Sequence, residues 1–168
     1  MKMMKAMTDI ALPPYDRTGL TTAIRAQFRV DWHGVHGPSH WARVRHHSIH
    51  LATVRQGDPL VAELFSYLHD SQRENEWTDP GHGERAAEYA VSLNGRFFDL
   101  APSRLDLLTT AMRFHSDGEL HSDATIQSCW DADRLDLGRV GKRPHPKYLS
   151  EHAHPLIKEA YEWSLSQK

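Results

Sequence analysis

The chain has 168 residues, of which 39% are apolar and 25% charged, and a formal net charge of -2. This length fits one domain with a hydrophobic core, and the aromatic content and low net charge exclude intrinsic disorder as the dominant state. No apolar run is long enough to cross a bilayer, and the balanced charge offers no basic surface for nucleic acid or an anionic membrane. The unusual feature is histidine: the chain holds 13, ten of them between positions 33 and 121.

Helical spacing of apolar residues recurs along the chain with little strict alternation, and it predicts an all-α fold. We expect one helical domain over residues 18–168, after an N-terminal extension (1–17) whose first nine residues lack the apolar stretch of a secretory signal. Prolines at positions 38, 59 and 102 suit the first turns of helices. The predicted helices span about 18–30, 38–56, 59 to between 69 and 73, 81–93, 102–115, 123–137 and 155–165.

The cysteine content limits both the cellular compartment expected for the protein and the types of metal ligand it can offer. Cys129 is the single cysteine, so it cannot form an internal disulfide, which favours a reducing cytoplasm. It also cannot build a metal site made mainly of thiolates. Any metal ligands are therefore imidazoles and carboxylates.

Four histidines border the apolar faces of four different predicted helices. They are His40, His69, His82 and His115. A single histidine on such a face is usually a hydrogen-bonded core residue. Four of them, with an adjacent His69-Asp70 pair, favour a metal site over a purely structural polar core.

Asp133 is the matching acidic residue on the helix predicted for 123–137. It lies in line with Ile126, Trp130 and Leu137, so helical periodicity turns it toward the interior. An ionised carboxylate there needs a cation, a hydrogen-bonding network or an open pocket. Imidazoles with carboxylates suit zinc, manganese, iron, cobalt or nickel, with magnesium where oxygens dominate.

The order His40, then His69-Asp70, then Asp133 resembles the signature of the HD-domain metal-dependent phosphohydrolase superfamily. The segment 65–70 resembles that family's helix ending in the paired ligands, and 132–135 resembles its closing motif. The resemblance covers about residues 38–141. It implies an HD-like helical bundle in which these four residues hold a divalent metal between the helices.

Two neighbouring acidic residues compete with Asp133 for the last ligand position. Both the helical periodicity and the Ala-Asp-Arg-Leu motif favour Asp133. We expect Asp131 and Asp136 on the flanks of the helix, paired with Arg134 or Arg139.

The remaining two pocket histidines leave two interpretations open. His82 and His115 resemble the extra histidines of HD proteins that hold two metals, in which the aspartate of the pair bridges both ions. Alternatively, they contact the substrate phosphate or orient a water. Of the other histidines, we expect His33 and His36 to be exposed in a loop. His46, His47 and His50 are expected to be solvated or next to the ligands.

The function implied by the resemblance is hydrolysis of a phosphate ester, on a small molecule or nucleotide, by a metal-activated water. The predicted catalytic residues are His69, Asp70, Arg73 and Glu74. The predicted substrate-binding residues are His82, His115, Arg134, Arg139 and Lys142. Two alternatives remain: a di-iron HD-type oxygenase using four histidines and two aspartates, and a non-catalytic module that binds a nucleotide.

Overall fold

The computed structural model describes residues 11–166, and the regular secondary structure of this part of the chain is helical apart from one isolated bridge between Asn94 and Phe98. The α-helices are α1 (Arg17–Gln27), α2 (Pro38–Val54), α3 (Pro59–Leu68), α4 (His82–Leu93), α5 (Pro102–Phe114), α6 (Ala124–Leu135) and α7 (Ile157–Leu165). Short 3-10 helices cover Leu137–Val140, Pro146–Tyr148 and His154–Leu156. The all-α prediction is confirmed.

The helices begin where local chemistry places them. Pro38, Pro59 and Pro102 each occupy a first turn, where a missing N–H has no consequence. The carboxylates of Asp58 and Asp123 cap α3 and α6 by accepting hydrogen bonds from backbone N–H groups of the first turn. Capping of this kind contributes about 1 kcal/mol per helix.

Several predicted helix ends differ from the structure by one to three residues, and the ends of α1 and α6 illustrate this. Helix α1 ends at Gln27 rather than near 30 because Phe28 takes an extended conformation and packs edge-on against Trp32 and Trp41, with ring centroids 5.4 and 5.5 Å away. Helix α6 ends at Leu135 and the chain continues as the 3-10 turn 137–140. At the end of α1, tertiary packing overrides the helical pattern of the sequence.

The start of the packed chain precedes residue 18. Residues 1–10 of the predicted extension lie outside the described residues. Of the rest, Tyr15 packs against the core and Asp16 caps α1 by accepting a hydrogen bond from Gly19.

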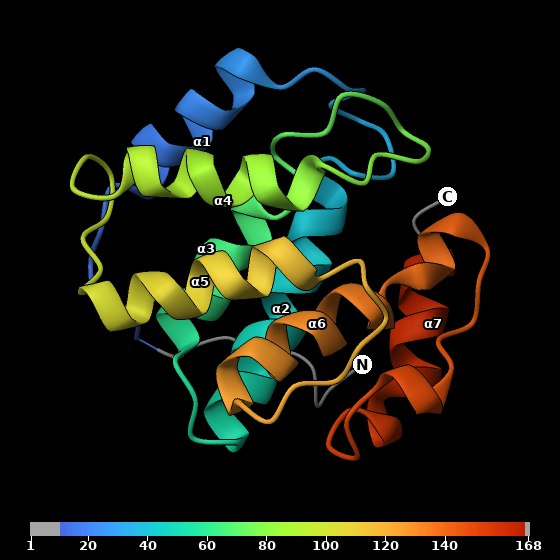
Figure 1. Cartoon of the computed structure of the whole chain (residues 1–168). Coiled ribbons are helices and arrows are strands. Elements are labelled where there is room, and N and C mark those ends of the chain that lie inside the picture. Colours follow the sequence, from blue (N-terminus) through green and yellow to red (C-terminus); the bar gives the residue numbers. More distant parts are fainter. Residues whose placement is uncertain (1–10, 167–168) are drawn as a thin grey trace.

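Helices α2 and α3 lie at the centre of the bundle (Figure 1). Helix α6 packs against both, and α4 and α5 pack against each other, with α5 also touching α3. The core includes Phe65, Leu68 and Met112, all fully buried. Burying one such side chain contributes about 1.5–3 kcal/mol.

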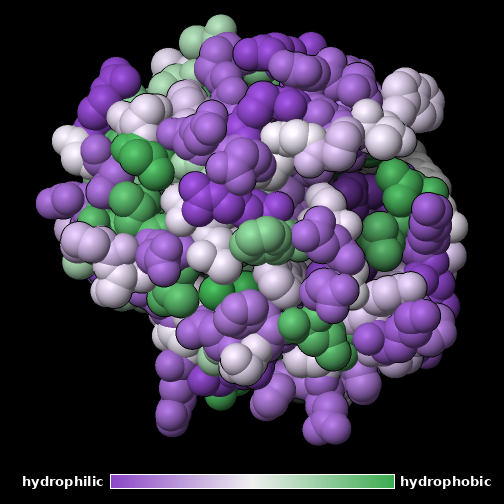
Figure 2. All heavy atoms as spheres, in the orientation of Figure 1, coloured by the Kyte–Doolittle hydropathy of each residue, from purple (hydrophilic) through white to green (hydrophobic). Residues whose placement is uncertain are grey.

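A smaller apolar cluster attaches the C-terminal segment. It joins Leu51 of α2 and Leu135 of α6 to Leu149, Ala153 and Ile157. The face drawn in Figure 2 is mostly hydrophilic, with apolar side chains scattered over it. Among the described helices, none combines the length and apolar character needed to cross a membrane.

Candidate metal centre

Six potential ligands lie at or next to helix ends that meet at one place. They are His40 in the first turn of α2, His69 and Asp70 just after α3, His82 at the start of α4, His115 just after α5, and Asp133 in the last turn of α6. Helix α5 returns alongside α4, so the start of α4 and the end of α5 lie at the same end of the pair (Figure 1). The antiparallel packing therefore gathers residues that are distant in sequence.

The first group of ligand atoms belongs to His40, His69 and Asp133. The Nε2 atoms of the two histidines are 3.1 Å apart, and they lie 3.2 and 3.5 Å from Asp133 Oδ1. Asp70 Oδ2 joins them at 3.5 Å from His40 Nε2 and 3.4 Å from His69 Nε2. We call these four residues the first cluster.

The second cluster consists of His82, His115 and the other oxygen of Asp70. The Nε2 atoms of His82 and His115 are 2.9 Å apart, and they lie 3.3 and 3.7 Å from Asp70 Oδ1. One carboxylate thus turns Oδ2 toward the first cluster and Oδ1 toward the second. The resemblance implies such a division as one of the two interpretations of His82 and His115, and the order of the residues along the chain does not decide between them.

Each of these four imidazoles has an acceptor at Nδ1. The acceptor is a backbone carbonyl for three of them: Phe65 for His69, Asp79 for His82 and Met112 for His115. For His40 it is the carboxylate of Asp136, with Nδ1 and Oδ2 2.6 Å apart. A proton held on Nδ1 leaves the lone pair of a neutral imidazole on Nε2, the atom that faces the clusters.

The donor set fits a divalent cation. Asp133 Oδ1 is buried and has no hydrogen-bond donor. The paired Nε2 atoms beside it carry lone pairs when the rings are neutral, so they do not satisfy it either. A cation between these atoms would give Asp133 Oδ1 a partner and relieve the repulsion between the Nε2 lone pairs. Imidazole nitrogens and carboxylate oxygens are ligands for first-row divalent metals.

The electrostatics of the clusters also favour positive charge. Burial would lower the pKa of His69, but the carboxylates of Asp70 and Asp133 outweigh it and raise that pKa to about 10. Burial likewise opposes ionisation of Asp70 and Asp133, yet the neighbouring histidines hold the pKa of each well below its ordinary range. The two carboxylates are therefore ionised at neutral pH and need a cation or an imidazolium beside them.

The comparisons with known proteins agree with this geometry. No protein-family model and no curated protein matches the chain. A crystal structure of a predicted HD superfamily hydrolase from an uncultured Thermotogales bacterium does match, with a TM-score of 0.67 and 25% sequence identity. The alignment covers 99% of this chain and 94% of the other. The chain has the fold of an HD-domain protein.

Two of the arginines predicted for the site border the clusters: Arg73, predicted as catalytic, and Arg139, predicted to bind substrate. Arg73 Nη1 lies 3.8 Å from Asp70 Oδ1 and 3.2 Å from both ring nitrogens of His82. Arg139 Nη2 lies 3.9 Å from Asp133 Oδ1, while its Nε donates to the carbonyl of Val35. The two guanidinium groups thus approach different clusters.

Other predicted site residues have partners elsewhere. Arg134 donates hydrogen bonds to the backbone carbonyls of Glu119 and Tyr148, both at 2.7 Å, and so links the segments that hold these two residues. Glu74 is about half exposed and accepts a hydrogen bond from Arg29 at 2.9 Å. Lys142 is exposed, just beyond the turn 137–140.

The expectation that Asp131 and Asp136 lie on the flanks of α6 was wrong, because both are fully buried. Asp131 accepts hydrogen bonds from Ser150 N and Oγ and from Gln127. Asp136 accepts from His40 and Arg43. Helix α6 is enclosed by α2, α3, α5 and the C-terminal segment, so it has little flank in solvent.

Two other histidines were also misplaced by the sequence analysis. His36, expected to be exposed, is buried, and its Nδ1 lies 2.5 Å from Glu76 Oε2. His47, expected to be solvated or beside the ligands, is buried edge-on against Trp163 of α7. His33 is exposed as expected.

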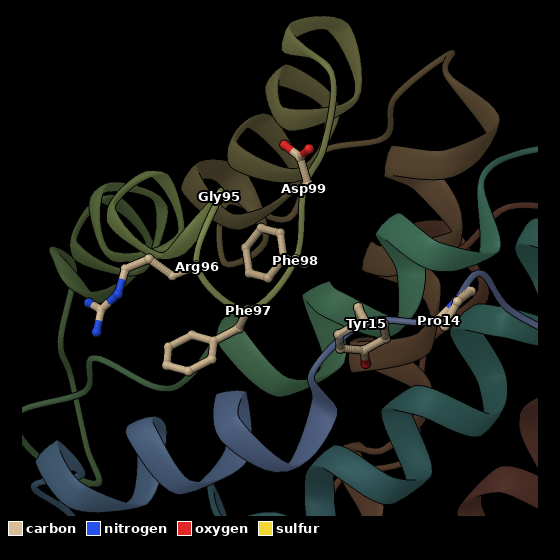
Figure 3. Close-up of a pocket in the computed structure, with 7 residues that line it drawn as sticks. All are labelled: Pro14, Tyr15, Gly95, Arg96, Phe97, Phe98 and Asp99. Carbon is tan, nitrogen blue, oxygen red and sulfur yellow. The ribbon is translucent and has the colours of Figure 1, made fainter.

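A separate surface depression of about 270 Å³ lies between residues 14–15 and the loop 95–99 (Figure 3). Three of its seven lining residues are aromatic, namely Tyr15, Phe97 and Phe98. It sits beyond Leu93, the far end of α4 from His82. Helix α4 has 12 residues and is therefore about 18 Å long, so its length separates the depression from His82.

Proposed function

We propose that this protein is a divalent-metal-dependent phosphohydrolase that hydrolyses a phosphate ester of a small molecule or nucleotide. The observation that carries the proposal is Asp70, whose two carboxylate oxygens face two separate groups of imidazoles. A carboxylate shared in this way suits two cations held side by side, an arrangement typical of phosphoester hydrolysis. The similarity to a predicted HD superfamily hydrolase supports the hydrolase class.

In this proposal the two clusters hold the metal. His40, His69 and Asp133 would bind one cation and His82 with His115 the other, while Asp70 contributes an oxygen to each. When bound, the metal lowers the pKa of a coordinated water toward neutrality and polarises a phosphoryl oxygen. The Nδ1 hydrogen bonds keep each imidazole oriented with Nε2 inward, so little rearrangement is needed on binding.

The arginines neutralise the charge of the phosphate. Arg73 and Arg139 border the clusters, and a planar guanidinium can bind phosphate oxygens in a bidentate manner. We assign these two to phosphate binding. Arg134 and Glu74 are engaged with backbone carbonyls and a surface arginine, so we assign them structural roles; Lys142 stays a candidate that would approach an anionic substrate from the surface.

A second candidate function uses the same residues. Four histidines and two aspartates also suit two irons that activate oxygen, and this count is met by the two clusters together. The distinction is chemical: one function consumes water and releases phosphate, and the other consumes oxygen.

The test combines metal analysis with an activity screen. The protein is purified anaerobically, its metals are quantified, and release of phosphate from a panel of phosphate esters is measured with manganese, cobalt, nickel or magnesium. We expect metal-dependent phosphate release that Asp133→Ala abolishes and Asp131→Asn, a buried aspartate of the same helix outside the clusters, retains.

Two results would contradict the hydrolase. Two bound irons with oxygen consumption and no phosphate release would favour the oxygenase. Saturable nucleotide binding without turnover under any metal would favour a non-catalytic module.

A further inference from the structure

The four inward-facing imidazoles are not held alike. Three of them have a neutral backbone carbonyl at Nδ1, and His40 has the carboxylate of Asp136. The Asp136 side chain is fully buried, and so is that of His40. This carboxylate belongs to neither cluster, yet it is one imidazole ring away from the first.

Arg43 fixes the orientation of Asp136. Its Nε lies 2.6 Å from Asp136 Oδ1 and its Nη2 3.1 Å from Oδ2, a bidentate pairing that leaves Oδ2 shared with His40. Arg43 Nη1 also donates to Ser39 Oγ at 2.8 Å. Arg43 follows His40 by one turn of α2, so the Asp136 carboxylate binds two residues of that helix. The guanidinium of Arg43 compensates the buried negative charge of Asp136.

A carboxylate on the far nitrogen of an imidazole does more than a carbonyl does. It fixes the tautomer and the ring plane, and its negative charge increases electron donation from Nε2 to a metal. The first cluster also contains two carboxylates, Asp70 and Asp133, whereas the second contains only the shared Asp70. Both effects strengthen cation binding on the side of His40.

We propose that Asp136 is a positioning residue that acts through His40 to make the first cluster the high-affinity cation site and leaves the second as the weaker one. The inference rests on the metal centre of the proposed function. It adds an order of loading: the first cluster fills before the second. Arg43 supports the same role by holding the carboxylate.

The experiment is a titration of metal-free protein with Mn²⁺ or Zn²⁺ against a chromophoric chelator, without substrate. For the wild type we expect two binding steps of different affinity. Asp136→Asn, which is nearly isosteric but uncharged, should weaken the tighter step about 10–100-fold and leave the weaker step unchanged. Asp131→Asn is the matched control, since this equally buried carboxylate binds Ser150 rather than a ligand, and both steps should remain.

Two further variants separate positioning from a merely structural role. His82→Ala should remove the weaker step and keep the tighter one. Asp136→Glu perturbs packing more than Asp136→Asn but retains the charge, so it should bind the first metal more tightly than Asp136→Asn does. Circular dichroism of each metal-free variant reports whether the fold is retained.

Several outcomes would overturn the inference: a single binding step in the wild type, loss of the tighter step in His82→Ala, equal weakening of both steps in Asp136→Asn, or weaker binding by Asp136→Glu than by Asp136→Asn. The titration is independent of turnover. If the wild type releases no phosphate while Asp136→Asn weakens the tighter step, the proposed function fails and the role of Asp136 stands. If the wild type hydrolyses phosphate esters and Asp136→Asn binds metal normally, the proposed function stands and the role of Asp136 fails.

Discussion

Stability of the fold should fall on acidification because of one buried histidine outside the metal centre. His47 of α2 packs edge-on against Trp163 of α7, with ring centroids 5.6 Å apart. Burial lowers its pKa from the ordinary 6.5 to about 3; His46, His50 and Arg43 act in the same direction, and Asp136 opposes them.

The sign follows from where the proton binds. The unfolded chain protonates His47 near pH 6.5 and the folded chain only near 3, so its contribution to stability is complete above 6.5 and is lost as the pH falls toward 3. Between pH 8 and pH 5 the loss amounts to about 2 kcal/mol, or about 4–8 °C in Tm for a domain of this size.

The assay is chemical denaturation of metal-free protein at pH 8 and pH 5, comparing the wild type with His47→Gln. Removing the metal and taking the difference between variants cancels the titration of the cluster histidines. The stability gap between wild type and His47→Gln should shrink by about 2 kcal/mol at pH 5. His152→Gln, at an exposed position, is the control. A gap that does not change with pH would refute the argument that burial keeps His47 neutral.

The remaining predictions concern the metal centre. Asp133→Ala should abolish metal retention. Asp131→Ala should keep the metal and lower the free energy of unfolding by about 1–3 kcal/mol, because the half-buried N–H and O–H donors of Ser150 lose their acceptor. Elemental analysis measures the bound metal and denaturation the stability, and a reversed pattern would reject the assignment of Asp133 as the ligand on α6. Replacing His82 and His115 together should reduce the bound metal from two ions to one, and an unchanged count would return these residues to the substrate pocket. Arg73→Gln should lower kcat/KM for phosphate esters by about 10–100-fold, as expected for the loss of one charged hydrogen bond, and leave the metal content unchanged. Steady-state kinetics and elemental analysis measure the two quantities, and loss of metal from the variant would contradict the role in phosphate binding.

The sequence by itself determined the helical class and the inward faces of the helices. A period of 3.6 residues turns Asp133 to the same side as Ile126 and Trp130, and capping residues such as Asp58 and Asp123 mark where helices start. These are local properties, written into consecutive residues. The chain order of His40, His69-Asp70 and Asp133 is also read directly from the sequence, and its resemblance to the HD-domain signature agrees with the structural comparison.

Only the tertiary structure decided which groups meet. Periodicity assigns a residue to a face but not to a partner. The sequence therefore left a bridging Asp70 as one of two interpretations, and its two oxygens are seen to face separate clusters only once α4 and α5 place His82 beside His115. The sequence analysis placed Asp136 on a flank of the helix for the same reason. Its burial follows from hydrogen bonds with His40 and Arg43, which lie more than 90 residues earlier in the chain. Contacts of that range follow from how α2 packs on α6, which no short stretch of sequence encodes.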